Sequence, residues 1–154
     1  MGERGFTYAD GKAALAAQKY AYGVPDWQNC PGFTQGTWDV AADHLPDFVL
    51  RLYVKVPGQR PDRPSVVLTL YEECLVRLDI NGAHDGAVGT HWQGDTQRGG
   101  SQWTRWAPDV LPEYPREPPV EPHWLHQALL AHAAYAKIDV AGVAWTDPPV
   151  GGLA

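Results

Sequence analysis

The strict alternation of apolar and polar residues between positions 48 and 56, FVLRLYVKV, constrains the fold more than any other feature of this chain. Because successive side chains of a strand point to opposite sides, this pattern predicts a half-buried strand. The same alternation returns in SVVLTLYE (65–72) and in LVRLDI (75–80). A Pro-rich loop and a short Glu-Glu turn join the three segments, and connections this short predict an antiparallel meander.

The polar side of this meander is predicted to form one continuous face. Its members alternate with the apolar residues of the three strands: Arg51, Tyr53, Lys55, Thr69, Tyr71, Arg77 and Asp79. The apolar side of such a sheet packs against helices. We therefore expect the polar face either to be solvated or to bind something.

The N-terminal third predicts one helix and little other regular structure. Thr7 and Asp10 resemble a capping box, and the Ala-rich stretch that follows ends before a Gly and a Pro. These signals predict a helix over residues 8–21. Residues 24–45 carry Pro, Gly and Asn among aromatic residues. We interpret this part as a packed irregular segment with a short strand near Trp38.

The C-terminal part predicts short strands, a strap and a second helix. Two shorter strands are expected near residues 89–93 and 102–106. Residues 107–122 hold six prolines, so we expect an extended strap over the surface. The sequence HWLHQALLAHAAYA then predicts a helix over residues 123–136.

Together these elements predict one α+β domain over residues 1–154. An antiparallel sheet of four to five strands would lie within residues 47–106, with the N-terminal and C-terminal helices on one of its faces. A chain of 154 residues is long enough to bury a core without a disulfide.

The net charge, hydropathy and cysteine content of the chain limit the kinds of partner and of cellular environment that we expect. The formal net charge of −6 argues against a general phosphate-binding surface, so nucleic acid is not an expected partner. No run of about 20 apolar residues occurs, so we expect no membrane span. Cys30 and Cys74 are far apart and no secretory signal is evident. These observations predict reduced thiols in a cytoplasmic protein.

The loop after the third strand is the first candidate site. Asp79, His84, Asp85 and His91 gather there, and His and Asp side chains bind divalent metals or transfer protons. In that interpretation they are candidate catalytic or metal-binding residues, and Arg77 stabilises an anionic transition state. The alternative is that Asn-Gly and Asp-Gly pairs close turns here and the histidines are surface groups, in which case no cofactor is needed.

Aromatic and histidine residues supply further candidates for binding. Trp92, Trp103 and Trp106, with Arg105 between the last two, suit either a partner-binding surface or core packing. His132 falls on the apolar stripe of the second helix and is expected in the core. His123 and His132 point to opposite sides of that helix, so they do not share a metal.

The stretch LVRLDINGAHDGAVGTHWQ, with the Trp-containing segment and helix after it, resembles small uncharacterised bacterial and phage proteins. Their pattern is a strand "LRxDxNG-H", a Gly-rich loop and a "G-x-H" strand. The resemblance covers about residues 66–138, and these positions carry it: Arg77, Asp79, Asn81, Gly82, His84, Gly89 and His91, with Trp103 or Trp106. The usual second histidine is replaced by Gln93. The resemblance implies no defined activity, and some such genes sit among mobile or defence elements.

Three functions follow from these features. The first is a non-enzymatic binding or accessory protein that engages a partner protein through the polar face and the 79–93 segment. This is favoured because no phosphate-binding loop and no nucleophile elbow occur in the sequence. The second is a small metal-dependent hydrolase or nuclease-like enzyme. The third is a small-ligand domain with a pocket between sheet and C-terminal helix, where His132 and Tyr135 supply polar contacts.

Overall fold

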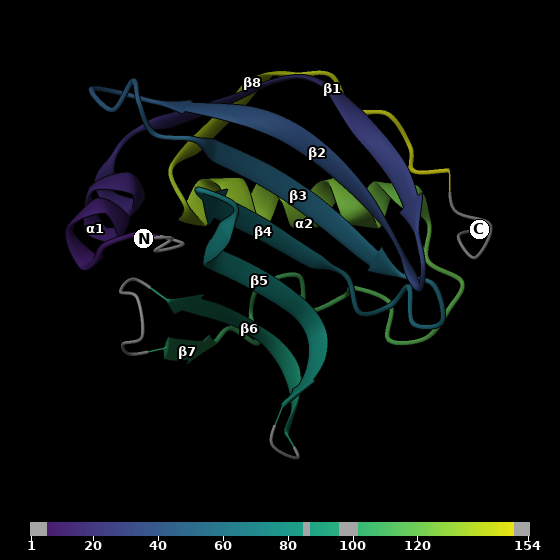
Figure 1. The fold of residues 1–154 in the computed structure, drawn as a ribbon. Helices are drawn as coiled ribbons and strands as arrows, with labels where there is room; N and C mark the ends of the chain where they lie inside the picture. The colour runs from purple at the N-terminus through teal and green to yellow at the C-terminus, as the bar shows by residue number, and fades with distance from the viewer. Residues whose placement is uncertain (1–5, 85–86, 96–101, 150–154) are drawn as a thin grey trace.

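The computed structural model describes residues 6–84, 87–95 and 102–149, which form one sheet and two helices (Figure 1). In chain order the elements are α1 (Tyr8–Ala16), β1 (Lys19–Cys30), β2 (Phe33–Ala42), β3 (Leu50–Pro57), β4 (Ser65–Leu70), β5 (Glu73–His84), β6 (Ala87–Asp95), β7 (Gln102–Trp106), α2 (Pro122–Tyr135) and β8 (Ile138–Val143). No helix among the described residues is long and apolar enough to cross a membrane.

The sheet is larger than the sequence predicts, and it is mixed. Its eight strands lie in the order β7-β6-β5-β4-β3-β2-β1-β8. The strands β1 to β7 pair antiparallel in sequence order, whereas β8 returns beside β1 and pairs with it in parallel. The α+β class is confirmed, but the four- to five-stranded antiparallel meander confined to residues 47–106 is wrong. In a meander each strand pairs with the strand next to it in the chain. The strand β8 does not follow this rule, because it comes after α2 in the chain and pairs with β1.

The first two strands replace the expected irregular segment at 24–45. In β2 every second residue is buried, namely Thr34, Gly36, Trp38 and Val40. This alternation is hard to see in the sequence because a glycine and a threonine occupy buried positions. In β1 the alternation is broken by a bulge, since pairing with β2 stops at Tyr22 and resumes at Asp26. A glycine and a proline within one strand fit such a bulge.

The first helix ends at Ala16, so the helix expected over 8–21 is too long. The buried Lys19 ends it: its Nζ donates to the carbonyl oxygens of Ala14 (2.6 Å), Leu15 (3.2 Å) and Ala17 (2.7 Å). A cation at the carboxyl end of a helix satisfies the last carbonyls and complements the helix dipole. Burial, and secondarily the charge of Lys137, lowers the pKa of Lys19 to about 8.

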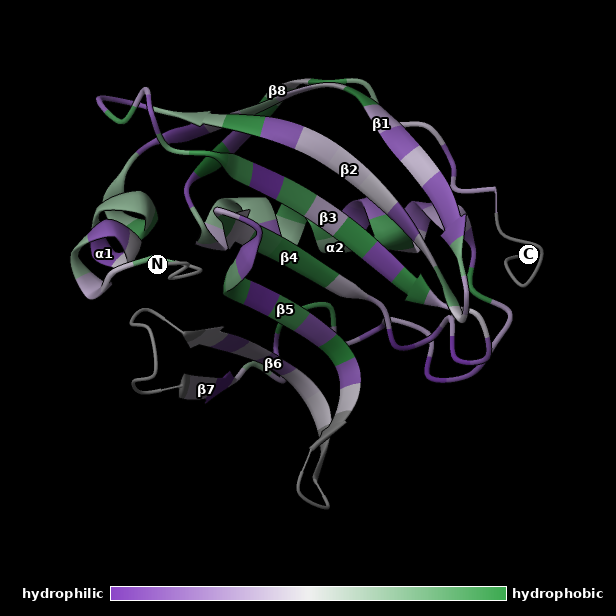
Figure 2. Cartoon of the chain, in the orientation of Figure 1, coloured by the Kyte–Doolittle hydropathy of each residue, from purple (hydrophilic) through white to green (hydrophobic). Residues whose placement is uncertain are grey.

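The second helix and the Pro-rich strap cover one face of the sheet. Figure 1 shows α2 behind the middle strands, and α1 lies beyond the ends of the strands rather than beside α2 on that face. Figure 2 shows apolar and polar residues alternating along β3 and β5, as a sheet with one covered face requires. The strap contributes the buried Tyr114 and Val120 to the core, and Leu125 and Leu129 come from α2. Cys30 and Cys74 form no disulfide.

Asn81 joins the strap to the sheet. The Asn-Gly pair was expected to close a turn, but β5 continues through it with a register shift against β6 between Asp79 and Gly82. Asn81 has a left-handed backbone (φ 52°) and is buried. Its Nδ2 donates to the carbonyl oxygens of Asp62 and Pro115, and its Oδ1 accepts from Arg116. The turn prediction was wrong because the bulge accommodates the left-handed residue inside the strand.

Candidate functional site

The face of the sheet opposite α2 is almost wholly polar, and we call it the open face. In Figure 1 no described helix crosses it over β2 to β5. Cross-strand partners share a face, so the register defines its members. One row of partners runs through Asp26, Thr37, Tyr53, Val67, Arg77, Gln93 and Thr104. The next row runs through Gln28, Gln35, Lys55, Ser65, Asp79, His91 and Trp106.

Asp79 is the centre of a hydrogen-bonded group on this face. Its Oδ1 accepts from the Ser65 hydroxyl at 2.7 Å, and its Oδ2 accepts from the Arg77 Nε at 3.0 Å. The His91 Nε2 lies 3.2 Å from the same Oδ2. Three neighbours therefore occupy this carboxylate, and the imidazole is only 2 % exposed. The arrangement fixes three strands to one another and leaves His91 out of reach of a substrate.

Two arginines of the open face are held by neighbouring side chains. Besides Asp79, Arg77 donates from its second terminal nitrogen to the Gln93 Oε1 at 2.9 Å. Arg51 donates to the Glu72 Oε1 at 2.7 Å and lies 3.8 Å from Asp39. The side chains of both arginines are about one-third exposed, so solvent screens these ion pairs. The pairs therefore fix the positions of the guanidinium groups more than they stabilise the fold.

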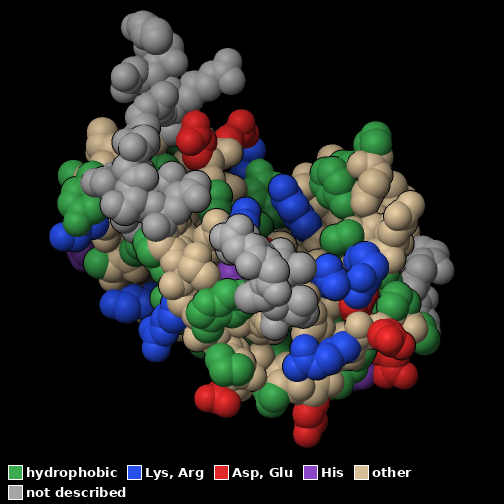
Figure 3. Space-filling view, turned by 90° about the horizontal axis from the view of Figure 1, so that it is seen from below, with side chains coloured by type: hydrophobic (Ala, Val, Ile, Leu, Met, Phe, Trp, Pro, Cys, Tyr) green, Lys and Arg blue, Asp and Glu red, His purple; other side chains and the backbone are tan. Residues whose placement is uncertain are grey.

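Large aromatic side chains are exposed at both ends of the open face. Trp106 in β7 is 47 % exposed and packs against His91, with 5.0 Å between the ring centroids. Tyr22 in β1 is 51 % exposed. Seen from below, the molecule is notched on the side of the open face, and Lys and Arg side chains lie at the notch (Figure 3). The face is thus a hollowed, polar surface with an aromatic residue on either side.

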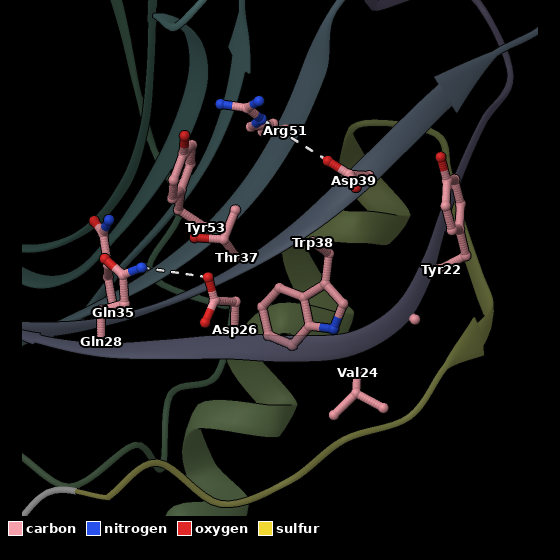
Figure 4. Close-up of a pocket in the computed structure, with 11 residues that line it drawn as sticks. Tyr22, Val24, Asp26, Gln28, Gln35, Thr37, Trp38, Asp39, Arg51 and Tyr53 are labelled. Carbon is pink, nitrogen blue, oxygen red and sulfur yellow. Dashed lines mark hydrogen bonds and ion pairs between the residues drawn. The ribbon is translucent and has the colours of Figure 1, made fainter.

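A hollow of about 570 Å³ opens where the bulge of β1 faces β2 and β3. Figure 4 shows Tyr22 and Tyr53 on opposite sides of it, with Asp26 and Asp39 between them. Trp38 forms part of its lining although the residue is only 1 % exposed. Its volume lies within the range of small-ligand pockets.

Several residues expected on the site lie on the other face. Trp92 is 4 % exposed and stacks on Tyr135 of α2 at 4.0 Å between centroids. Trp103 packs over Gly94, where a β-carbon would come within 2.5 Å of the indole. Arg105 pairs with Trp92 across β6 and β7 and is exposed. Trp92, Arg105 and Tyr135 border a second cavity of about 420 Å³ between the sheet and the end of α2. It lies where the small-ligand hypothesis expects a pocket.

His132 is fully buried, as the apolar stripe predicts. It stacks against Trp92 at 5.3 Å, and neither ring nitrogen has a hydrogen-bond partner among the described residues. Burial lowers the pKa of His132 to about 3, because the charged imidazole has no solvation there. The residue therefore packs as a neutral aromatic ring and does not border the second cavity.

The structure brings together two of the four residues expected to bind a metal, Asp79 and His91. The side chains of Asp79 and His91 are in contact. His84 lies five residues after Asp79 in β5 and pairs there with Ala87 of β6. The side chain of His84 and the whole of Asp85 lie outside what the structure describes. Among the described residues, no group of three His, Cys, Asp or Glu side chains is placed to hold a metal ion. A divalent metal therefore stays a prediction that rests on His84 and Asp85.

Sequence reasoning missed the part of the open face that β1 and β2 supply. Tyr22, Thr37 and Asp39 continue the rows that begin in β3, but β1 was not expected and β2 was expected only as a short strand near Trp38. The Thr-x-Asp spacing in β2 is the same alternation as in β3 and could have indicated the second strand. No feature of the sequence indicates that Trp38 borders a hollow.

Comparison with family models, with curated proteins and with solved structures gave no match, so the site is interpreted on its geometry alone.

Proposed function

We propose that this chain is a binding protein without catalytic chemistry of its own, and that it engages a partner protein through the open face. The observation that carries the proposal is the pair of side-chain rows that cross seven strands and that no helix of the described residues covers. Such a face is rigid because every member stands on a paired strand, and a rigid surface loses little entropy when it binds.

The composition of the face supports a protein partner. Trp, Tyr and Arg are the residues that most often contribute strongly to protein interfaces. The open face combines the exposed Trp106 with Arg77 and, at its other end, Tyr22. Its acidic and basic side chains are largely paired with one another, so association would not depend on one strongly charged partner.

The Asp79 group supports a binding role over a catalytic one. Ser65, Arg77 and His91 already contact three of the about four lone-pair sites of this carboxylate, so a substrate proton would compete with these contacts. The hydrolase alternative lacks this kind of support, because no three His, Cys, Asp or Glu side chains of the described residues are placed to hold a metal ion.

The test uses the tagged chain to capture partners from its source cells, followed by reconstitution with the purified partner. Arg77→Ala and Trp106→Ala should each weaken the measured affinity by about tenfold or more. Tyr8→Ala and Lys12→Ala provide matched controls, because Lys12 lies over the Tyr8 ring on α1, away from the open face. Controls that lose binding equally, or open-face variants that bind as the wild type does, would contradict the proposal.

A further inference from the structure

The strand β7 forms one edge of the sheet, and this edge is uncovered in the part of the chain that the structure describes. It pairs with β6 on one side, and in Figure 1 no described helix or strand lies beyond it. An edge strand carries unpaired backbone groups, and native proteins usually protect such edges. An unprotected edge can accept a further strand from another chain.

The opposite edge of the sheet, β8, is protected in two ways. Its register with β1 shifts, because Tyr20 pairs with Asp139 whereas Tyr22 pairs with Gly142. The Asp139 Oδ1 also accepts from the backbone N–H of Ala141 at 2.8 Å, so a side chain of the strand itself satisfies this donor. Bulges and such side chains discourage the addition of a strand. The strand β7 pairs with β6 without a register shift, and no described side chain bonds to its backbone.

The hydrogen bonds between β6 and β7 show which backbone groups face outward. The N–H of Ala107 donates to the carbonyl oxygen of Thr90 at 3.0 Å. Hydrogen-bonded pairs alternate with non-hydrogen-bonded pairs in an antiparallel ladder, so Arg105 also directs its backbone groups at β6. Thr104 and Trp106 therefore present their N–H and carbonyl groups to the free edge, where no described residue bonds to them.

The cavity of about 420 Å³ adjoins this edge on the side of the sheet that α2 covers. Its walls are mainly apolar and aromatic, with Trp92 from β6, Val110 from the strap, and Ala131 and Tyr135 from α2. Tyr135 stacks on Trp92 and is itself 37 % exposed, so an apolar surface is accessible there. In strand addition the main chain supplies affinity, and pockets that take alternate side chains supply specificity.

Arg105 determines the charge that such a segment would carry beside the cavity. Its side chain borders the cavity, is exposed, and has no ion pair or hydrogen bond among the described residues. Residues opposite each other on neighbouring strands interact directly, and opposite charges there are favourable. Asp109 also borders the cavity, but it belongs to the strap and not to the strand that an added segment would pair with.

We propose that β7 accepts an extended segment of the partner protein as a further strand of the sheet, with an apolar side chain in the cavity and a carboxylate opposite Arg105. This inference rests on the proposed function and deepens it, because the open face ends at β7 and a partner seated there reaches this edge. A second copy of the chain fits less well, since pairing of two β7 strands would bring another Arg105 to a place that favours a carboxylate.

Short capped peptides test the proposal, with binding measured by fluorescence polarisation of the labelled peptide. The probe peptide alternates threonine with one leucine and one glutamate at neighbouring alternate positions, so that both side chains fall on one face of a strand. A matched peptide carries lysine in place of the glutamate and should bind about tenfold more weakly. Two further peptides are methylated at alternate amide nitrogens, one for each edge of the probe. One of them should lose binding and the other should keep it, because only one edge pairs with β7.

Two variants of the protein, each with a matched control, examine the edge and the charge separately. Thr104→Pro removes an outward N–H, which an edge strand tolerates, and should weaken binding of the probe by about tenfold. Thr104→Ala keeps that N–H and should bind as the wild type does. Arg105→Glu should reverse the preference, so that the lysine peptide binds better than the glutamate peptide. Lys12→Glu changes the net charge equally on α1 and should keep the wild-type preference.

The proposal is overturned if no peptide binds, or if both methylated peptides bind as well as the probe. Self-association of the chain that Thr104→Pro abolishes in sedimentation would also overturn it, because the added strand would then be a second copy. Arg77→Ala should leave peptide binding unchanged, since Arg77 lies on the open face. If Arg77→Ala loses the partner but no peptide binds, this inference alone fails. If the probe binds as expected but Arg77→Ala and Trp106→Ala keep the partner, the proposed function alone fails.

Discussion

The His91 Nε2 lies 3.2 Å from the Asp79 Oδ2, across the neighbouring strands β5 and β6. The other ring nitrogen, Nδ1, is 3.2 Å from the carbonyl oxygen of Gly89 in the same strand as His91. The imidazole is thus held at both nitrogens and covered by Trp106. Asp79 and His91 share one site, which links β5 to β6.

We predict that Asp79→Ala and His91→Phe are strongly non-additive in stability. Each variant removes the same buried contact, so the double-mutant cycle should give a coupling free energy of about 1 kcal/mol or more. Urea unfolding of the four proteins measures it. The exposed pair Arg51 and Glu72 is the control, with coupling below about 0.5 kcal/mol because solvent screens it. Equal coupling in the two cycles would show that Asp79 and His91 behave as a surface pair.

Asn81→Ala should destabilise the protein by about 2–4 kcal/mol. The change leaves the carbonyl oxygens of Asp62 and Pro115 without their donor, and it places alanine at a φ of 52°, where asparagine is better tolerated. Asn81→Gly relieves the backbone strain but not the lost hydrogen bonds, so it should recover only about 1 kcal/mol. Full recovery with glycine would mean that the amide contributes nothing.

Gly36→Ala should destabilise the protein by about 1–3 kcal/mol, because a β-carbon at this position would lie 2.8 Å from the Trp27 ring. The cost should nearly vanish in a Trp27→Leu background, where the smaller side chain leaves room. Thermal unfolding of the two single variants and the double variant measures this. If the cost persists in the Trp27→Leu background, the backbone and not the indole requires the glycine.

The central strands could be predicted because their signal is local. In β3, Leu50, Leu52 and Val54 are buried as the alternation requires. In β5, Val76, Leu78 and Ile80 are buried in the same way, whereas β4 is buried at every residue from Val66 to Leu70. The polar face could be predicted for the same reason, since Arg77 and Asp79 take the outward positions of β5. Long-range information was not needed for any of these residues.

The strands β1 and β8 could not be predicted, because their position in the sheet depends on contacts between residues that are far apart in the sequence. The strand β1 contains a bulge with Gly23 and Pro25, and its pairing with β8 depends on α2 bringing Ile138 beside Lys19. Thr69 was expected on the outward, polar side of the sheet and is nevertheless buried, as is Val67 in the same strand. The meeting of Asp79 with His91 depends on the register across the bulge after Asp79, which no local pattern reveals.

Acid should destabilise this protein through His132. Burial holds its pKa at about 3 in the folded state, against an ordinary value of 6.5 in the unfolded chain. The unfolded state therefore binds one more proton between these two values, and stability falls as the pH drops below 6.5. The slope from this one residue is about 1.4 kcal/mol per pH unit at its steepest.

His132→Leu isolates this contribution, because leucine fills the site beside Trp92 and does not titrate. At neutral pH the variant should be as stable as the wild type or more so, since it removes two buried nitrogens without partners. Urea unfolding between neutral and mildly acidic pH should then show a gap that widens in favour of the variant as the pH falls. His123→Leu, a change at an exposed histidine of the same helix, should show no such widening. Parallel curves for wild type and His132→Leu would mean that His132 finds a partner or solvent when it is protonated.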